Sequence, residues 1–305
     1  MENRNLLSYI IILLKGMAMG AADVVPGVSG GTIAFISGIY EELITSINNV
    51  NVALLNTLRK EGIKAFWIKL NGNFLLALLL GIGISVLSLA KLISWLMENE
   101  PIPLWSFFFG LVVASIMLVG REIKKWNVAA ILLLIMGAAI AFYITKLPPS
   151  DNSGSLPYLF LSGALAICAM ILPGISGAFI LVLLGSYKTV LDAVHERDLK
   201  IIVTVGLGAI FGLLSFAKLL KWMFTHYKNL TLALLTGFIL GSLNKIWPWK
   251  EVLETKMFGD KIITISDRNI LPFSFDGDPQ LISAIILAIL GFSLIFILEK
   301  LAAKR

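Results

Sequence analysis

Cysteine, histidine and charged residues are scarce in this sequence. One cysteine, Cys168, among 305 residues excludes an intramolecular disulfide, and two histidines leave few ligands for a metal site. Charged residues make up 14% of the chain, well below the roughly 25% of an average soluble domain. With 58% hydrophobic residues and a mean hydropathy of +0.90, the composition predicts an integral membrane protein and argues against a soluble one.

The net charge of +6 comes from scattered basic residues, which suits cytoplasmic loops and argues against nucleic acid as a partner. The first apolar run, 6–22, is short, and Ala21-Ala22 could serve as the cleavage region of a signal peptide. The same pattern recurs inside the chain at 157–187, where no signal peptide can lie. We therefore interpret 6–22 as part of the membrane domain.

Two stretches of the chain have similar sequences. Residues 16–40 and 163–187 are identical at nine of 25 aligned pairs when Pro26 is placed on Pro173, and they share the core P-G-[VI]-S-G. Proline and glycine break helices, and a break at membrane depth survives only if it is buried in protein or lines a wet cavity. Such interruptions at matching places in two halves of a chain are the best sequence indication of a transporter's binding site.

The similarity continues beyond these motifs and divides the chain into two repeats, 1–150 and 151–305. The first repeat is expected to hold a hairpin at 6–47 and spans at 73–97, 103–120 and 127–146, and the second a hairpin at 157–191 and spans at 200–224, 229–246 and 280–301. Each leg of the first hairpin is about 16 residues, below the roughly 20 needed to cross a bilayer. We therefore predict re-entrant hairpins, with two tilted spanning helices as the alternative.

A hairpin returns the chain to its starting side, and three spans then carry it across. The expected fold is an all-α integral membrane protein of inverted-topology repeats, each a re-entrant helical hairpin plus three transmembrane helices. The loops agree with this parity: those at 48–72 and 121–126 and the C-terminal end are basic and predicted to be cytoplasmic, whereas those at 98–102, 192–199 and 247–279 are acidic or mixed and predicted to be outside. The last has room for a β-like element around Lys261–Asp267, to which the sequence assigns no role.

The two turns have the ingredients of an anion site. Ser29 and Ser176 are good N-caps, and the glycines beside them let the backbone approach a ligand closely. The leg after each turn then begins with free N–H groups and the positive end of a helix dipole, which suits phosphate. Inverted symmetry would bring both tips together near the midplane. The alternative is that the glycines only allow helices to pack closely.

Helix ends alone cannot hold a buried anion. A dipole end contributes roughly 0.3–2 kcal/mol, whereas transfer of a bare ion to low dielectric costs on the order of 20 kcal/mol. Side-chain cations are therefore needed, and Lys91 and Lys218 occupy matching positions inside predicted spans. Snorkelling of both lysines to the membrane surface is the alternative.

Four further charged residues lie near the hairpins. Lys15 and Lys188, together with Asp23 and Glu41, are candidates for coupling or gating. The alternatives are that Asp23 caps the tip amides and that Glu41 lies in the cytoplasmic interface. No P-loop, GxSxG motif or metal-binding cluster occurs, so we expect no catalytic residue, metal or cofactor.

The first motif, residues 20–32 followed by Gly38-Ile39-Tyr40-Glu41, resembles the bacterial polyprenyl-phosphate translocase family of the PopT type, formerly a domain of unknown function, and the second motif fits it too. The resemblance covers about 5–300. It implies a multi-pass flippase of the bacterial cytoplasmic membrane that returns undecaprenyl phosphate from the outer to the cytoplasmic leaflet for cell wall biogenesis. The family motif maps onto Asp23, Pro26, Gly27, Ser29, Gly30, Gly31 and Thr32, and onto Pro173, Gly174, Ser176 and Gly177.

The second motif has Ala178-Phe179 where the first has Gly31-Thr32, so we expect the first hairpin to hold more of the phosphate. The function predicted is a lipid-phosphate flippase that works by alternating access. Three alternatives stay open: a transporter of a small soluble anion, a membrane enzyme acting on a lipid phosphate, and a structural membrane protein without transport. The sequence does not determine the driving force or the assembly, with which a homodimer is compatible.

Overall fold

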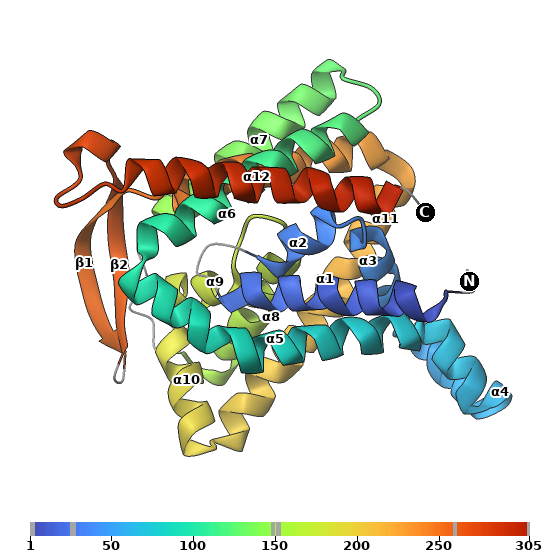
Figure 1. The fold of residues 1–305 in the computed structure, drawn as a ribbon. Coiled ribbons are helices and arrows are strands. Elements are labelled where there is room, and N and C mark those ends of the chain that lie inside the picture. Colours follow the sequence, from blue (N-terminus) through green and yellow to red (C-terminus); the bar gives the residue numbers. More distant parts are fainter. Residues whose placement is uncertain (1–3, 25–28, 148–149, 151–153, 259–260, 304–305) are drawn as a thin grey trace.

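The computed structural model describes residues 4–24, 29–147, 150, 154–258 and 261–303. The first half contains α1 (Leu6–Val24), α2 (Gly30–Ile36), α3 (Tyr40–Asn48), α4 (Val52–Leu70), α5 (Gly72–Asn99), α6 (Pro101–Glu122) and α7 (Val128–Lys146). The second half contains α8 (Leu156–Ile171), α9 (Gly177–Leu183), α10 (Tyr187–Glu196), α11 (Leu199–Ser242), the 3-10 turns η1 (Leu243–Ile246) and η2 (Pro272–Ser274), strands β1 (Lys250–Phe258) and β2 (Lys261–Asn269), and α12 (Leu281–Ala303). Figure 1 shows the arrangement.

Within the described residues, five helices are long and apolar enough to cross a membrane: Leu6–Asp23, Gly72–Leu89, Pro101–Glu122, Val128–Lys146 and Leu199–Ile246. The longest, α11, has 44 residues, or about 66 Å at the usual helical rise. This is twice the roughly 30 Å of a hydrocarbon core. It is broken at Tyr227 (φ −136°, ψ 44°), between the two spans predicted at 200–224 and 229–246. The chain is therefore an all-α membrane protein, to which a two-stranded hairpin is added.

The leg that follows each turn consists of two short helices. Gly38 (φ 73°) separates α2 from α3, and Gly185 (φ 66°) separates α9 from α10. These left-handed backbone angles suit glycine and end a helix. The axes of α9 and α10 consequently differ by 113°. In the first half, α1 begins and α3 ends at the same end of the molecule, next to α4 (Figure 1).

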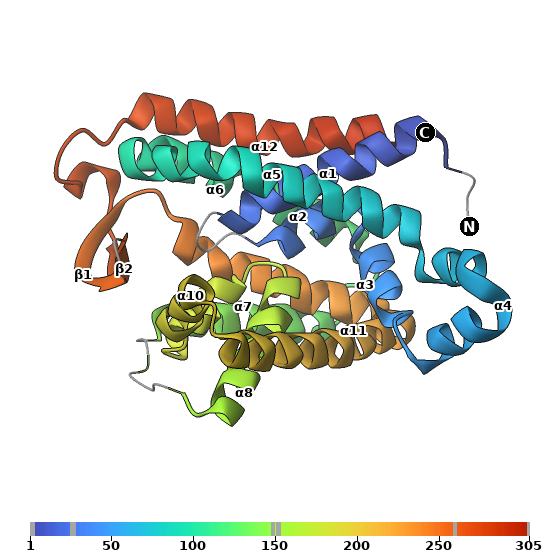
Figure 2. The same ribbon diagram turned by 90° about the horizontal axis from the view of Figure 1, so that it is seen from below.

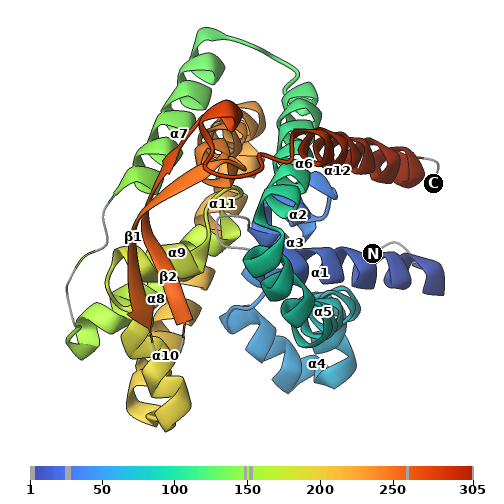
Figure 3. The same cartoon turned by 60° about the vertical axis from the view of Figure 1, so that its left-hand side comes forward.

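The helices form two layers, which Figure 2 shows edge-on: α1, α5, α6 and α12 lie in one layer, and α7, α8, α10 and α11 in the other. The last long helix of each half packs against the other half, α7 on α11 and α12 on α6, as Figure 3 also shows. Glycines bring these backbones together: a Cβ on Gly237 would lie 2.1 Å from Leu134 O, and one on Gly110 would lie 1.9 Å from Ala288 O. The two halves therefore cannot separate without breaking tight helix contacts.

A small antiparallel sheet lies at the end of the molecule opposite α4 and the described chain ends (Figure 1). Strand β1 pairs with β2 from Lys250↔Asn269 to Phe258↔Lys261, with an irregular register near Val252–Thr255. This hairpin occupies the loop in which the sequence left room for a β-like element. Its base joins η1 and packs near the N-terminal end of α6.

Candidate functional site at the hairpin tips

The two motif turns contact each other in the interior. The Ser29 hydroxyl donates to Met170 O at 2.8 Å, and Gly174 N–H donates to Thr32 Oγ1 at 2.8 Å. These bonds join residues more than 140 positions apart, and Ser29 and Thr32 are 0% and 1% exposed. Hydroxyl groups of the first tip are thus bonded to backbone groups of the second tip. Pro26 and Gly27 lie outside the described residues, whereas Pro173 is buried beside Gly174.

Side chains already occupy the first N–H groups of α2. Asp23 Oδ1 accepts from Gly30 N–H at 2.7 Å, and Ser29 Oγ accepts from Gly31 N–H at 3.1 Å. The sequence predicted free amides here, and the structure corrects that prediction. A carboxylate at this position complements the positive end of the helix dipole. The second tip differs, because Ser176 makes no side-chain cap bond to α9.

The glycines of the first tip allow a contact that no larger residue would permit. A Cβ on Gly31 would lie 2.4 Å from Ile171 O, and a Cβ on Gly30 would lie 2.5 Å from Asp23 Oδ2. The N-terminal end of α2 therefore lies directly against the C-terminal carbonyls of α8. Opposite ends of two helix dipoles meet there, which is electrostatically favourable. On the other tip, Gly174 has φ +92°, a backbone angle that favours glycine.

The predicted lysines are not gathered around the tips. Lys91 on α5 and Lys218 on α11 have exposed side chains, and no hydrogen bond or ion pair between described residues links either one to the tips. Their positions suit snorkelling. Lys15 Nζ instead donates to Ser37 O at 2.6 Å, where it complements the negative end of α2. Lys188 is exposed on α10.

The two glutamates of α3 have different environments. Glu41 pairs with Lys228 at 2.6 Å, and about half of each side chain is exposed. Glu42 is more enclosed: both terminal nitrogens of Arg4 donate to it at 2.7 Å, and Asn71 Nδ2 donates at 2.8 Å. The sequence singled out Glu41 and gave Glu42 no partner, since Arg4 and Asn71 are distant along the chain. Glu42 fastens α3 to the N-terminal segment and to the start of α5.

No group of three or more histidine, cysteine, aspartate or glutamate side chains in the described part of the chain is arranged to hold a metal ion. The groups that the site does offer are hydroxyls, backbone N–H groups and one carboxylate. Such groups can bind and release an oxyanion by exchanging hydrogen bonds. They contain no nucleophile paired with a base, as covalent catalysis would require.

Comparison with known proteins identifies the family. A family model described as VCA0040-like, undecaprenyl phosphate translocase-like, matches residues 19–262, a region that includes both tips. The chain belongs to this family. The resemblance carried by the two motifs is thereby confirmed, and the family description names translocases, which are transporters and not enzymes.

Two known proteins are similar to this chain over most of their length. A protein of Vibrio cholerae named polyprenyl-phosphate transporter is 46% identical over 303 residues, which cover 98% of each chain. A Staphylococcus aureus protein of the same name is 33% identical over 256 residues, which cover 78% of this chain and 86% of the relative. No solved structure matches the chain significantly.

Proposed function

We propose that the chain is a polyprenyl-phosphate flippase of the bacterial cytoplasmic membrane. In this proposal it carries undecaprenyl phosphate from the outer to the cytoplasmic leaflet, and the hairpin tips bind the phosphate. Family membership and the names of both relatives support the substrate class. The observation that carries the proposed mechanism is the direct hydrogen bonding between the two tips, through Ser29 to Met170 and through Gly174 to Thr32.

The tip contact has the chemistry of a closed gate. In the closed arrangement, N–H groups of Gly30, Gly31 and Gly174 and the hydroxyls of Ser29 and Thr32 bond to protein atoms. Separation of the tips would release the Ser29 hydroxyl and the Gly174 N–H, whose bonds cross between the tips, and phosphate oxygens are strong acceptors that could take the place of their partners. Little net hydrogen-bond energy is then lost when a protein partner is exchanged for phosphate, so opening and binding can compensate each other.

Asp23 connects this exchange to a proton. Its carboxylate holds the Gly30 N–H that phosphate would need, and two anions cannot share one donor without repulsion. Protonation of Asp23 would remove the repulsion and release the amide. We therefore propose Asp23 as the coupling residue, and Asp23→Asn should flip lipid with a flattened pH profile. A variant with the pH profile of the unmodified protein would remove Asp23 from the mechanism.

The re-entrant hairpins and inverted repeats belong to the same proposal. Each hairpin would enter and leave the membrane on a single side, and the two hairpins would do so from opposite sides. The two layers of helices would rock about the tips. Because α7 and α12 each pack on the opposite half, a movement in one half is transmitted to the other. The basic C-terminal end and α4 would then face the cytoplasm, and the β hairpin would face outward.

The deciding experiment measures flipping of labelled undecaprenyl phosphate in liposomes that contain the purified protein. We expect protein-dependent flipping, its loss in a Ser29→Leu, Ser176→Leu double variant, and its retention in Ser88→Leu, which changes an exposed serine on α5. Elution as a folded, monodisperse species must be the same for all three proteins. Absence of flipping by the folded protein at every pH and potential tested would refute the proposal and favour a soluble anion as substrate.

A further inference from the structure

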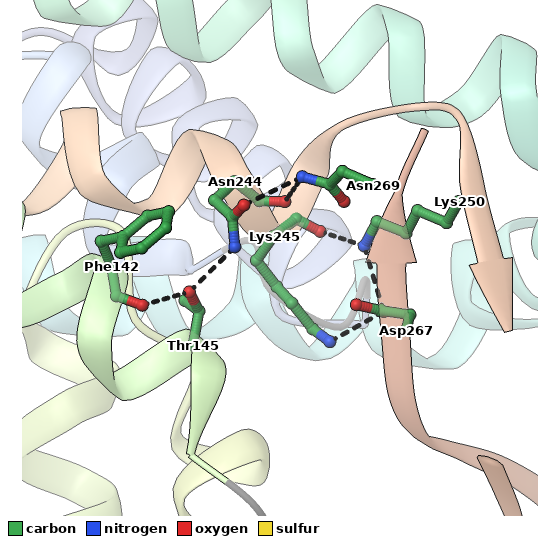
Figure 4. A network of polar contacts seen from close by, with 7 residues as sticks. All are labelled: Phe142, Thr145, Asn244, Lys245, Lys250, Asp267 and Asn269. Atoms are coloured by element: carbon green, nitrogen blue, oxygen red, sulfur yellow. Dashed lines mark hydrogen bonds and ion pairs between the residues drawn. The ribbon is translucent and has the colours of Figure 1, made fainter. Parts of the chain in front are cut away.

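A cluster of charged side chains lies away from the tips, at the base of the β hairpin (Figure 4). Lys245 Nζ and Lys250 Nζ both contact Asp267 Oδ2, at 3.0 and 3.4 Å. All three side chains are largely enclosed, with 13–18% of each exposed. Two ammonium groups therefore share a single carboxylate oxygen, and the cluster retains a surplus positive charge.

Aromatic rings and a third lysine complete the surroundings. Lys245 lies over the ring of Phe179, Lys250 lies over the ring of Trp105, and Lys146 lies over the ring of Phe142. Burial, partly offset by Asp267 and reinforced by the charges of Lys245 and Lys146, lowers the pKa of Lys250 to about 8. The ammonium group is thus still charged at neutral pH, but a further anion would stabilise it.

The cluster lies next to an apolar groove between α7 and α11. The groove has a volume of about 540 Å³ and is lined by apolar residues of α7 and α11, among them Leu134, Phe142 and Leu240, and by Asn244. Asn244 belongs to both features, because it donates to Thr145 at 3.2 Å and accepts from Asn269 at 2.9 Å beside Lys245 (Figure 4). The apolar groove thus lies next to the cationic cluster, and Asn244 connects the two.

Tryptophans pack beside this cluster. Trp247 and Trp249 lie 5.4 Å apart between ring centres and each donates its indole N–H to a backbone carbonyl. Trp249 is buried against Ile102 and Ala284, and Trp247 is half-buried beside it. Trp105 lies near the start of α6 and Lys146 ends α7, and both helices are long and apolar enough to cross a membrane. A bilayer around these spans would therefore place the cluster near its headgroups.

We propose that Lys245, Lys250 and Lys146 form a docking site for the phosphomonoester headgroup of a polyprenyl phosphate, whose first isoprene units lie in the groove between α7 and α11. The inference rests on the proposed function and adds a second site, at which the lipid is captured before it reaches the tips. A phosphomonoester carries a charge of about −1.5 to −2 at neutral pH, which matches the excess of three lysines over one aspartate. A prenyl chain matches the apolar groove.

The position of Phe179 connects this docking site to the tips. Phe179 follows Gly177 by two residues on α9, and its ring contacts Lys245. The residue that replaces Thr32 in the second motif therefore faces the docking cluster and not the opposite tip. This difference gives a reason for the asymmetry between the motifs: the first tip bonds across the centre, and the second tip lies beside the site of entry.

The test measures binding of undecaprenyl phosphate to the full-length protein in nanodiscs, with undecaprenol and inorganic phosphate as comparison ligands. A Lys245→Gln, Lys250→Gln double variant should bind undecaprenyl phosphate about tenfold or more weakly, and undecaprenol as before. Asp267→Asn should bind the phosphate lipid more tightly, since it removes the competing carboxylate. Arg268→Gln, which alters an exposed basic residue paired with Glu251 on the same hairpin, should change neither affinity.

Opposite effects of the lysine and aspartate variants are what a merely structural cluster would not produce. If both variants are folded and their affinities for undecaprenyl phosphate change little, or change in the same direction, the inference is overturned. Tight binding of inorganic phosphate, with displacement of the lipid, would assign the cluster to free phosphate and overturn the lipid docking site. The proposed function is judged separately, by flipping. If the wild-type protein flips the lipid and the lysine variant binds it with unaltered affinity, only the docking site is refuted.

Discussion

Thr32 offers the sharpest test of the contact between the two tips. Replacing it with valine keeps the volume and the β-branch but removes Oγ1, which accepts the Gly174 N–H at 2.8 Å. Both residues are buried, so no water can replace the lost acceptor. An unsatisfied buried N–H costs about 1–3 kcal/mol. We expect Thr32→Val to lower the free energy of unfolding by about 2 kcal/mol on this basis.

A matched control comes from Thr236, which is also buried and also lies in a helix. Its hydroxyl donates to Leu232 O, one turn earlier in α11, where that carbonyl also accepts the regular helical N–H. Thr236→Val therefore leaves no donor orphaned and should cost only about 0.5–1 kcal/mol. Unfolding of both variants by increasing SDS fractions in mixed micelles, followed by circular dichroism, measures the difference.

Hydrogen exchange gives a second measure of the same bond. If closed tips are the ground state, a loss of about 2 kcal/mol increases the population of separated tips by about 30-fold. Backbone amides of α2 and of the turn around Gly174 should then exchange faster in Thr32→Val than in Thr236→Val. Equal unfolding free energies and equal exchange in the two variants would show that the tips are not joined as described, and would remove the structural basis of the proposed gate.

Three further predictions concern packing, pH and ion pairs. Gly31→Ala should reduce flipping and stability, because its Cβ would lie 2.4 Å from Ile171 O. Gly83→Ala, whose Cβ would have nothing within 4 Å, should leave stability unchanged or raise it by up to about 1 kcal/mol. Flipping and thermal unfolding of both variants measure this difference. The pKa of Lys250, lowered mainly by burial from 10.5 to about 8, means that the unfolded chain holds one more proton between these values. The free energy of unfolding should therefore rise between pH 8 and 10.5, by at most on the order of 3 kcal/mol, and Lys250→Met should lack this rise when unfolding is measured at pH 7.5 and 10. Glu42→Gln should lower the free energy of unfolding by about 1–3 kcal/mol, because it breaks an enclosed bidentate pair, and the half-exposed Glu41→Gln by less than about 1 kcal/mol; equal losses in denaturant titrations would refute this contrast.

Hydropathy predicted the long helices well because the bilayer sets their length. The spans expected at 73–97, 103–120 and 127–146 fall on α5, α6 and α7, with differences of two residues or fewer at each boundary. The loop at 48–72 is an exception, since its polar sequence contains α4, interrupted at Gly62 (φ 84°). A polar helix outside the membrane has no apolar run to signal it, and its N-cap Asn51 was the available clue.

The chemistry of the candidate site was only partly predictable. The motif identifies Ser29, Thr32 and Gly174 as important, because a helix break between apolar runs needs a reason. It does not show that their hydrogen-bonding groups satisfy one another, since bonds across 140 residues depend on how the halves meet. The direction in which Lys91 and Lys218 point depends likewise on which helix faces are packed, and lysine spacing carries no information on that.

Composition and the repeated motif by themselves determined the class of the protein: an apolar, charge-poor chain with a duplicated helix break is a membrane protein, and the motif placed it in its family. These properties are local or additive, so the order of residues is enough to read them. Only the tertiary structure decided three features: the packing of α7 and α12 against the opposite half, the closed contact between the tips, and the Lys245–Lys250–Asp267 cluster. Each depends on backbones that approach within contact distance from remote parts of the chain, and the packing of the whole molecule sets that distance.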